Sequence, residues 1–187
     1  MSIRALFDPV PVIQSERLII RKLEQDDADD LKAMVCNDNI YRYAPAFLFE
    51  LKYEDIHEVI DKLYTECLEE SLILGVFLNS GEFCGLAEFY GYSEALHKIS
   101  IGYRSNEKVW GKGIATEAVK LMLGYLDANT DITTVTASTL HENKAAASVL
   151  RKTGFKLIES ETPEDWGYEE PLPADKWVNV HYVIYTA

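Results

Sequence analysis

The amino-acid sequence predicts one mixed α/β (α+β) domain built on a twisted, mostly antiparallel sheet with helices on its faces. Its 187 residues, 48% of them hydrophobic, are enough for one compact core without disulfides or metals. Strand-like runs in the middle of the chain follow one another across short turns, which favours antiparallel neighbours. Segments with helical spacing flank these runs, and the chain contains no internal repeat, low-complexity tract or linker.

The first third of the chain predicts a strand followed by two helices. Residues 15–23 are typical of a strand, and the apolar spacing becomes helical from Asp26 onward. Asp26 and Asp27 suit the first turn of a helix because carboxylates complement the positive end of its dipole. Residues 53–68 predict a second amphipathic helix. Its apolar stripe consists of Ile56, Val59, Ile60, Leu63 and Cys67.

The rest of the chain predicts an antiparallel meander followed by alternating helices and strands. The meander strands are residues 72–78, 83–90 and 98–104, with Asn79-Ser80-Gly81 as a tight turn. The later helices are residues 114–126 and 143–153, the later strands are residues 132–137, 155–159 and 177–185, and Gly154 is expected to cap the second helix. We expect residues 1–12 to form an N-terminal extension and residues 13–187 to form the single domain.

Composition excludes several classes of protein. A net charge of -13 and a pI near 4.7 argue against nucleic acid or an anionic membrane as partner, because both need a basic face. No apolar run approaches the roughly 18 to 20 residues that cross a bilayer. The chain starts without a secretory signal, so we expect a cytoplasmic protein. The three cysteines and four histidines have no metal-site spacing, so we expect no metal.

A glycine turn between a strand and a helix is the segment most indicative of function. Gly111 and Gly113 allow a sharp turn and a close approach of ligand to backbone, and the helix that follows presents free N–H groups. Such a turn favours a phosphate or pyrophosphate. Two glycines before a helix are weak evidence alone, and a purely structural turn explains them equally well. The segment is neither a P-loop nor a dinucleotide fingerprint.

Together with four other segments, this turn resembles the GNAT acetyltransferase superfamily. Residues Lys108-Val109-Trp110-Gly111-Lys112-Gly113 are similar to its loop Arg/Gln-x-x-Gly-x-Gly/Ala. Residues 114–118 (IATEA) and 101–103 (IGY) resemble the branch that includes the ribosomal-protein N-terminal acetyltransferases, as do residues 15–21 (SERLIIR). Residues 143–155, an Asn followed by a helical run and Gly-Phe, resemble a later helix of that branch. The resemblance spans residues 13 to 185.

The resemblance implies a GNAT fold with two splayed central strands, residues 98–104 and 132–137, that bind acetyl-CoA between them. It implies pantetheine contacts from the backbone of Tyr103, Arg104 and Ser105, and from Asn143. Asn143 is equally well explained as a helix N-cap, and it can serve both purposes. The resemblance also implies pyrophosphate contacts from the backbone of Val109, Trp110, Gly111, Lys112, Gly113, Ile114 and Ala115. We expect the Trp110 side chain to pack rather than to bind adenine.

The sequence departs from the family at the proton donor. Leu150 stands where many members have a tyrosine that protonates the leaving thiolate, and Ala146 stands where the N-terminal acetyltransferase branch often has a serine. Ser148 is expected to face away from Ala146, because it lies some 200° around the helix from it. We therefore expect no acid on this helix. Direct attack can still proceed by positioning and by backbone polarisation of the carbonyl.

Glu88 is the first candidate for the catalytic base. It is a lone carboxylate in an apolar central strand, and burial would raise its pKa. The competing interpretation is an outward-facing glutamate on a half-exposed strand. Tyr90, Tyr92 and Tyr103 are weaker candidates.

The expected reaction is acetyl transfer from acetyl-CoA to a primary amine by direct attack in a ternary complex. The amine belongs to a small cationic molecule or a protein N-terminus, and the protein is expected to be a monomer or homodimer. An acidic run before the last strand is compatible with a cationic acceptor or with a solvated loop. The run consists of Glu159, Glu161, Glu164, Asp165, Glu169, Glu170 and Asp175. The alternative function is a catalytically weak coenzyme-A-binding regulatory or sensor domain.

Overall fold

The protein folds around one eight-stranded sheet. A computed structural model describes residues 2–43, 45–165 and 170–180. Within these residues the strand order is β1-β2-β3-β4-β5-β6-β8-β7, and neighbours are antiparallel except β5 and β6, which are parallel. The strands are β1 Ile13–Gln14, β2 Leu18–Arg21, β3 Ser71–Leu78, β4 Phe83–Ser93, β5 Lys98–Ser105, β6 Thr134–Leu140, β7 Lys156–Glu164 and β8 Leu172–Val180. The mixed, mostly antiparallel sheet is the fold class that the sequence predicts.

Helices cover both faces of the sheet. They are α1 Ile3–Leu6, α2 Ala28–Val35, α3 Asp38–Tyr41, α4 Ile56–Glu58, α5 Tyr64–Glu66, α6 Ile114–Asn129 and α7 Lys144–Lys152. Alternation along β4 sends Ala87 and Phe89 into the core cluster that also contains residues of α6 and α7. Leu86 belongs instead to the second cluster, formed with α2 and the helical turns around α4 and α5. Glu88, two residues along the strand, lies on the same face as Leu86.

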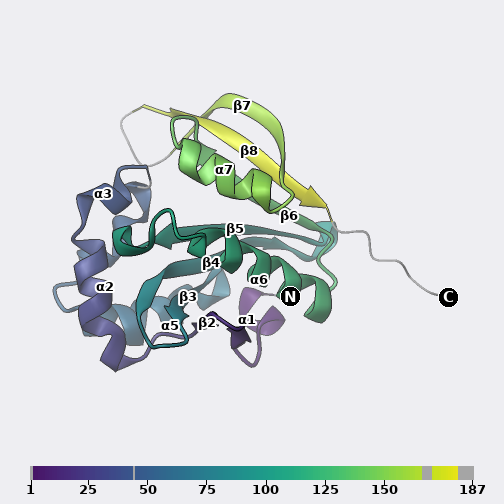
Figure 1. The fold of residues 1–187 in the computed structure, drawn as a ribbon. Helices are drawn as coiled ribbons and strands as arrows, with labels where there is room; N and C mark the ends of the chain where they lie inside the picture. The colour runs from purple at the N-terminus through teal and green to yellow at the C-terminus, as the bar shows by residue number, and fades with distance from the viewer. Residues whose placement is uncertain (1, 44, 166–169, 181–187) are drawn as a thin grey trace.

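The two central strands β5 and β6 separate after a short pairing. Lys98, Ile99 and Ser100 pair with residues 134–136, and no further pairing follows although β5 runs on to residue 105 and β6 to residue 140. Each strand remains bonded on its other side, β5 to β4 and β6 to β8. The part carrying β6–β8 and α7 therefore rises away from the part carrying β1–β5 (Figure 1). This confirms the splayed strands.

The start of the chain packs against the main core. Ile3 and Phe7 lie in the segment expected to be an extension, and both are buried. The ring of Phe7 is 4.9 Å from that of Phe89 on β4.

Most predicted elements are present, with three changes. The helix expected over residues 53–68 is present as one uninterrupted helical run over residues 56–69, but it is irregular: α4 leads into a π-helical turn Val59–Leu63, then α5 and a 3-10 turn Cys67–Glu69. Much of the expected acidic loop belongs to β7, whose residues are mostly exposed and so carry no apolar alternation. The last strand begins at Leu172 rather than 177, and residues 181–185 of that prediction lie outside the described residues.

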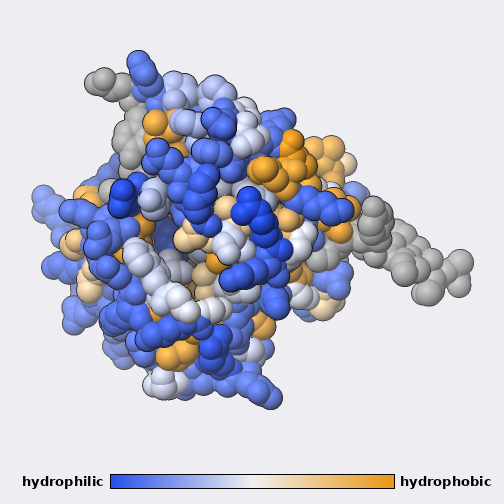
Figure 2. Space-filling model, turned by 45° about the horizontal axis from the view of Figure 1, so that its top comes forward, coloured by the Kyte–Doolittle hydropathy of each residue, from blue (hydrophilic) through white to orange (hydrophobic). Residues whose placement is uncertain are grey.

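The molecular surface is mainly hydrophilic, as its charge suggests. In Figure 2 hydrophilic residues cover most of the visible face, and hydrophobic residues gather near the end of the described chain. Leu157, Ile158 and Val180 are exposed there, at the paired ends of β7 and β8. In the described part of the chain no helix is both long and apolar enough to cross a membrane.

A buried ion pair joins β5 to the 3-10 segment Pro45–Lys52. Arg104 Nη1 lies 2.7 Å from Glu50 Oε1, and the two side chains are only 5% and 0% exposed. Tyr64 of α5 donates a hydrogen bond to the same carboxylate oxygen at 3.0 Å. Arg104 Nη1 also donates to the hydroxyl of Tyr41 in α3 at 3.3 Å. The pair thus ties three helical segments to the central sheet.

Removing the charge of Glu50 should destabilise the fold strongly. Glu50→Gln keeps the side-chain shape but removes the carboxylate that balances the buried guanidinium, which should lower the free energy of unfolding by about 3 kcal/mol. Glu58→Gln is the matched control. Its pair with Lys62 is exposed to solvent, so the substitution should leave the free energy of unfolding nearly unchanged. Urea denaturation measures the free energy of unfolding of both variants. Equal changes in the two would show that the buried Glu50 pair stabilises the fold no more than the exposed pair does.

Candidate active site

The turn before α6 has the backbone conformation of an anion cradle. Gly111 and Gly113 have φ angles of 73° and 77°, a region that favours glycine. A Cβ at Gly111 would meet no atom within 4 Å, so its need for glycine is conformational, and the space before it is open. Gly113 is the N-cap of the 16-residue helix α6 and provides no side-chain cap. The N–H groups of the first turn of α6 can therefore serve a ligand.

Several amides of this turn are used internally. The N–H groups of Val109, Trp110 and Lys112 donate to the carbonyls of Asn106, Glu107 and Val109, respectively. Lys112 also does not line the groove described below. The 3-10 turn over Glu107–Val109 accounts for the bonds of Val109 and Trp110, and the Lys112 bond follows it, so these three amides already have partners. The remaining candidates are Gly111, Gly113, Ile114 and Ala115, together with Thr116, which the sequence reasoning missed.

An ion pair supports the turn from behind. Arg17 Nη1 donates to the carbonyl of Lys112 at 3.3 Å, and its Nε donates to Glu117 on α6 at 2.7 Å. Ser15 donates to the same carboxylate at 2.7 Å. Burial works to raise the pKa of Glu117, but hydrogen bonds from Ser15 and Arg17 outweigh it and lower that pKa. Ser15 and Arg17, from the segment at residues 15–21, therefore contact Glu117, from the segment at residues 114–118, and these contacts fix the start of α6.

A groove of about 490 Å³ runs from this turn along β5 and α7. All the predicted cofactor-binding residues except Lys112 line it. Trp110 lines the groove at 49% exposure and donates its indole N–H to the Ser105 carbonyl at 3.0 Å, so it is only partly packed. The groove also has lining residues that sequence reasoning did not select. These are Asn39, Ile40, Tyr43, Thr116, Ala145, Ala146, Ser148, Val149 and Lys152.

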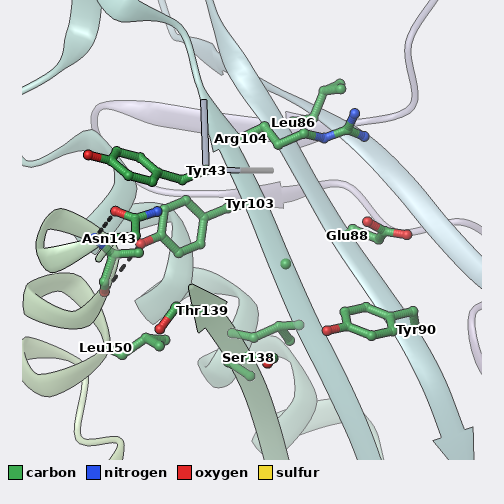
Figure 3. A pocket seen from close by; sticks show the side chains of 14 residues that line it. Tyr43, Leu86, Glu88, Tyr90, Tyr103, Arg104, Ser138, Thr139, Asn143 and Leu150 are labelled. Carbon is green, nitrogen blue, oxygen red and sulfur yellow. Dashed lines mark hydrogen bonds between the residues drawn. The ribbon is translucent and has the colours of Figure 1, made fainter. Parts of the chain in front are cut away.

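The groove leads into a deeper cavity of about 110 Å³ between the splayed strands. Five residues line both spaces, so the two adjoin, and we call them together the passage: Tyr43, Tyr103, Arg104, Asn143 and Ala146. Figure 3 shows Tyr103 and Asn143 at the α7 side of this cavity, with Glu88 and Tyr90 reaching it from β4. Divergence of β5 and β6 is what opens the passage.

Glu88 lies in the cavity rather than on an exposed face. It is 7% exposed, and its neighbour across the ladder is Gly102, which leaves space before the carboxylate. Burial raises the pKa of Glu88. The charge of Arg104 and a hydrogen bond with Ser71 lower it in part, and Glu50 raises it further. A buried carboxyl whose pKa is raised, in a cavity, is a candidate for proton exchange with a ligand.

Tyrosines complete one side of the cavity. Tyr90 lines it, and burial raises the pKa of its hydroxyl. Tyr92 does not line the cavity and packs against the main core. Ser138 of β6 also lines the cavity and is hydrogen-bonded to Glu164 of β7. The acidic run therefore reaches the cavity wall through Glu164, while its residue Glu169 lies outside the described part of the chain.

Two sides of α7 face the passage. Asn143 caps the helix by accepting from the Ala146 N–H at 3.0 Å, and it also lines both spaces. Ala146 and Leu150 face the cavity, and their side chains have no hydrogen-bonding atom. Ser148 lines the outer groove, so the expectation that it points away was incomplete. The groove follows a second side of the helix because the strands beneath it have separated.

The described residues contain no group of three or more His, Cys, Asp and Glu side chains that could hold a metal ion. A glycine turn at a helix N-terminus, continuous with a cavity that contains a buried carboxylate, is an arrangement suited to group transfer from a phosphate-bearing carrier.

Comparison with known proteins identifies the class as acyltransferase. Residues 17–156 match the family described as "Acetyltransferase (GNAT) domain". The chain belongs to this GNAT acetyltransferase family. It is 23% identical over 177 residues to the uncharacterized N-acetyltransferase YoaA of Bacillus subtilis (strain 168), covering 93% of this chain and 97% of that protein.

Solved structures share the fold. A GNAT-family acetyltransferase from Bacillus anthracis has a TM-score of 0.78 at 22% identity, covering 91% of this chain and 98% of that one. Spermidine N-acetyltransferase from Vibrio cholerae, in complex with CoA and spermine, has a TM-score of 0.73 at 19% identity, covering 89% and 97%. The ribosomal L7/L12 alpha-N-protein acetyltransferase RimL, in complex with coenzyme A, has a TM-score of 0.77 at 15% identity, covering 91% and 98%.

Proposed function

We propose that the protein transfers an acetyl group from acetyl-CoA to a primary amine by direct attack within a ternary complex. The observation that carries this proposal is the single passage from the glycine turn to Glu88. The carrier occupies the groove, the amine occupies the cavity, and the two meet where β5 and β6 separate. Because both reactants are held in one passage, positioning contributes to the rate.

Acetyl-CoA fits the groove through backbone groups. Its pyrophosphate is assigned to the amides of Gly111, Gly113 and the first turn of α6. The unpaired edge of β5 beyond Ser100 offers backbone groups to the pantetheine arm, as an additional strand would. Asn143 stands beside that edge at the start of α7.

A primary amine suits the charge of the cavity. Glu50 and Arg104 pair at 2.7 Å, and Glu88 is the one carboxylate among the described residues that line the cavity. Tyr43, Tyr90 and Tyr103 provide aromatic and hydroxyl surface for an ammonium group. Two structural neighbours are named for amine acceptors, spermidine in one and a ribosomal-protein N-terminus in the other. Both acceptor types remain within the proposal.

Glu88 is assigned as the base. The ionised carboxylate accepts a proton from the amine, directly or through a water, as the new C–N bond forms. The pKa of Glu88 is raised, so the carboxylate must lose its proton before it can act. Turnover should therefore fall as the pH drops through that raised pKa.

The alternative is a coenzyme-A-binding regulatory or sensor domain. It is favoured by one observation, the absence of a hydroxyl at Ala146 and Leu150 on the cavity side of α7. This alternative requires only that coenzyme A binds in the groove, without acetyl transfer.

Release of free thiol from acetyl-CoA distinguishes the two functions. The wild-type protein should be assayed with spermidine and with a peptide that has a free N-terminus, each beside a counterpart in which every amine is acetylated as a blocked control. Mass spectrometry of the amine identifies the product. Amine-dependent thiol release with an acetylated product supports the enzyme. Coenzyme A binding with only amine-independent hydrolysis, across a broad panel of amines, supports the sensor.

Substitution at the glycine turn should weaken coenzyme A binding. Gly111→Ala forces a side chain into a φ of 73°, which should lower affinity about tenfold by shifting the amides that face the pyrophosphate. Gly124→Ala, within α6, is the matched control because its Cβ also meets nothing within 4 Å and its φ is not positive. Titration calorimetry measures both. The same affinity for coenzyme A in the two variants would show that the pyrophosphate does not bind at this turn.

Replacing Glu88 should change the pH dependence of turnover while sparing cofactor affinity. Glu88→Gln keeps the size of the side chain and removes the base, so kcat/KM should fall on the order of 100-fold near neutral pH. The fall in kcat/KM at low pH that results from protonation of Glu88 should be absent in this variant. Glu82→Gln, on the exposed β3–β4 turn, is the control. Profiles of equal height and shape for wild type and Glu88→Gln would exclude the assigned role.

A further inference from the structure

The junction between groove and cavity is where the reacting bond must lie. This follows from the proposed function, on which the inference rests, because the carrier enters from the groove and the amine waits in the cavity. The junction is lined by the five residues common to both spaces. The bond that breaks there, between carbon and sulfur, leaves negative charge on the sulfur in a largely buried setting. Such a charge needs a hydrogen-bond donor close by.

Helix α7 offers no side-chain hydroxyl at this junction. Ala146 lies there, and Leu150 faces the adjoining cavity. The amide oxygen of Asn143 accepts from the Ala146 N–H, which leaves the Nδ2 amino group of that side chain as a donor on α7, but not a hydroxyl. The guanidinium of Arg104 is held at 2.7 Å by Glu50. A hydroxyl donor for the sulfur must therefore come from another element of the junction.

Tyr103 places a hydroxyl at this position from the opposite side. Its side chain extends from β5 to the start of α7, where the hydroxyl lies 3.5 Å from the carbonyl oxygen of Ala146 (Figure 3). Hydrogen bonds between a hydroxyl and a carbonyl oxygen are usually about 2.7 to 2.8 Å long, so this contact is weak. The hydroxyl can therefore turn to a stronger acceptor without losing a good bond.

We propose that the hydroxyl of Tyr103 donates a hydrogen bond to the departing thiolate, and so supplies from β5 the hydroxyl that α7 lacks at the junction. The C–N bond forms as the C–S bond breaks, and the electron pair of the C–S bond stays on sulfur. Glu88 takes the amine proton.

Tyr103 keeps its own proton during this step. Burial raises the pKa of its hydroxyl above the ordinary value of 10.0. An alkyl thiol has a pKa of about 8.5, so full transfer from the tyrosine to the thiolate is unfavourable. Tyr103 therefore acts as a fixed donor, and the thiolate receives a proton from solvent after it leaves the site. The proton on Glu88 also returns to solvent, which closes the balance.

The ionisation of bound coenzyme A tests the assignment without turnover. The thiol pKa of coenzyme A bound to the wild-type protein can be followed by the ultraviolet absorbance of the thiolate across pH. A donor to the thiolate should lower that pKa relative to free coenzyme A. In Tyr103→Phe it should rise by about one unit or more, the effect of losing a hydrogen bond to a charged group. Tyr125→Phe, a half-buried tyrosine of α6 outside the passage, should match wild type.

Turnover provides the second readout. In Tyr103→Phe, kcat should fall on the order of 100-fold while KM for acetyl-CoA stays within a few-fold, because the bond forms mainly to the departing charge. Calorimetric binding of coenzyme A to the variant shows that it is folded. Tyr43→Phe removes the other tyrosine hydroxyl at the junction and should leave the thiol pKa near the wild-type value.

The outcomes separate this inference from the proposed function. A bound-thiol pKa equal in wild type and Tyr103→Phe, or one that rises in Tyr43→Phe instead, overturns the role of Tyr103 while acetylation by the wild type stands. Absence of amine-dependent acetylation in the wild type overturns the proposed function. A wild-type thiol pKa that is lowered, and is restored by Tyr103→Phe, supports the donor contact.

Discussion

The separation of β5 from β6 is the constraint on which the rest of the site depends. The two strands pair over three residues each and then follow different partners, β4 on one side and β8 on the other. Their facing edges are left without strand partners, and a buried backbone edge needs hydrogen bonds from another source. An extended ligand arm can meet that need. The groove, the cavity and the junction between them all result from this one divergence.

Buried charge determines what the passage can accept. Burying the guanidinium of Arg104 would be costly alone, and Glu50 compensates it at 2.7 Å from a segment far away in the sequence. The compensation leaves Glu88 as the carboxylate that faces the cavity, with its pKa raised by burial. Two roles are thereby assigned to two acidic residues. Glu50 fixes the position of Arg104, a lining residue of the cavity, and Glu88 is available to exchange a proton.

The sequence predicted those parts of the fold and site that depend on local pattern. Apolar runs located β3, β4 and β5, and the glycine turn located the start of α6. The extent of the polar strand β7 was harder to predict, because its exposed residues have no apolar alternation. Contacts between distant segments could not be read from the sequence. These include the Glu50–Arg104 pair, the second lining side of α7 that contains Ser148, and the approach of the Tyr103 hydroxyl to Ala146.

Hydrogen–deuterium exchange with and without coenzyme A tests the central claim that the divergence of β5 and β6 forms the cofactor passage. The account predicts slower amide exchange on binding in residues 101–105 and 111–116, with β3 at residues 71–78 unchanged. The first segment is the free edge of β5, and the second is the glycine turn with the first turn of α6. Saturating coenzyme A that protects neither segment, or that protects residues elsewhere instead, would contradict the account.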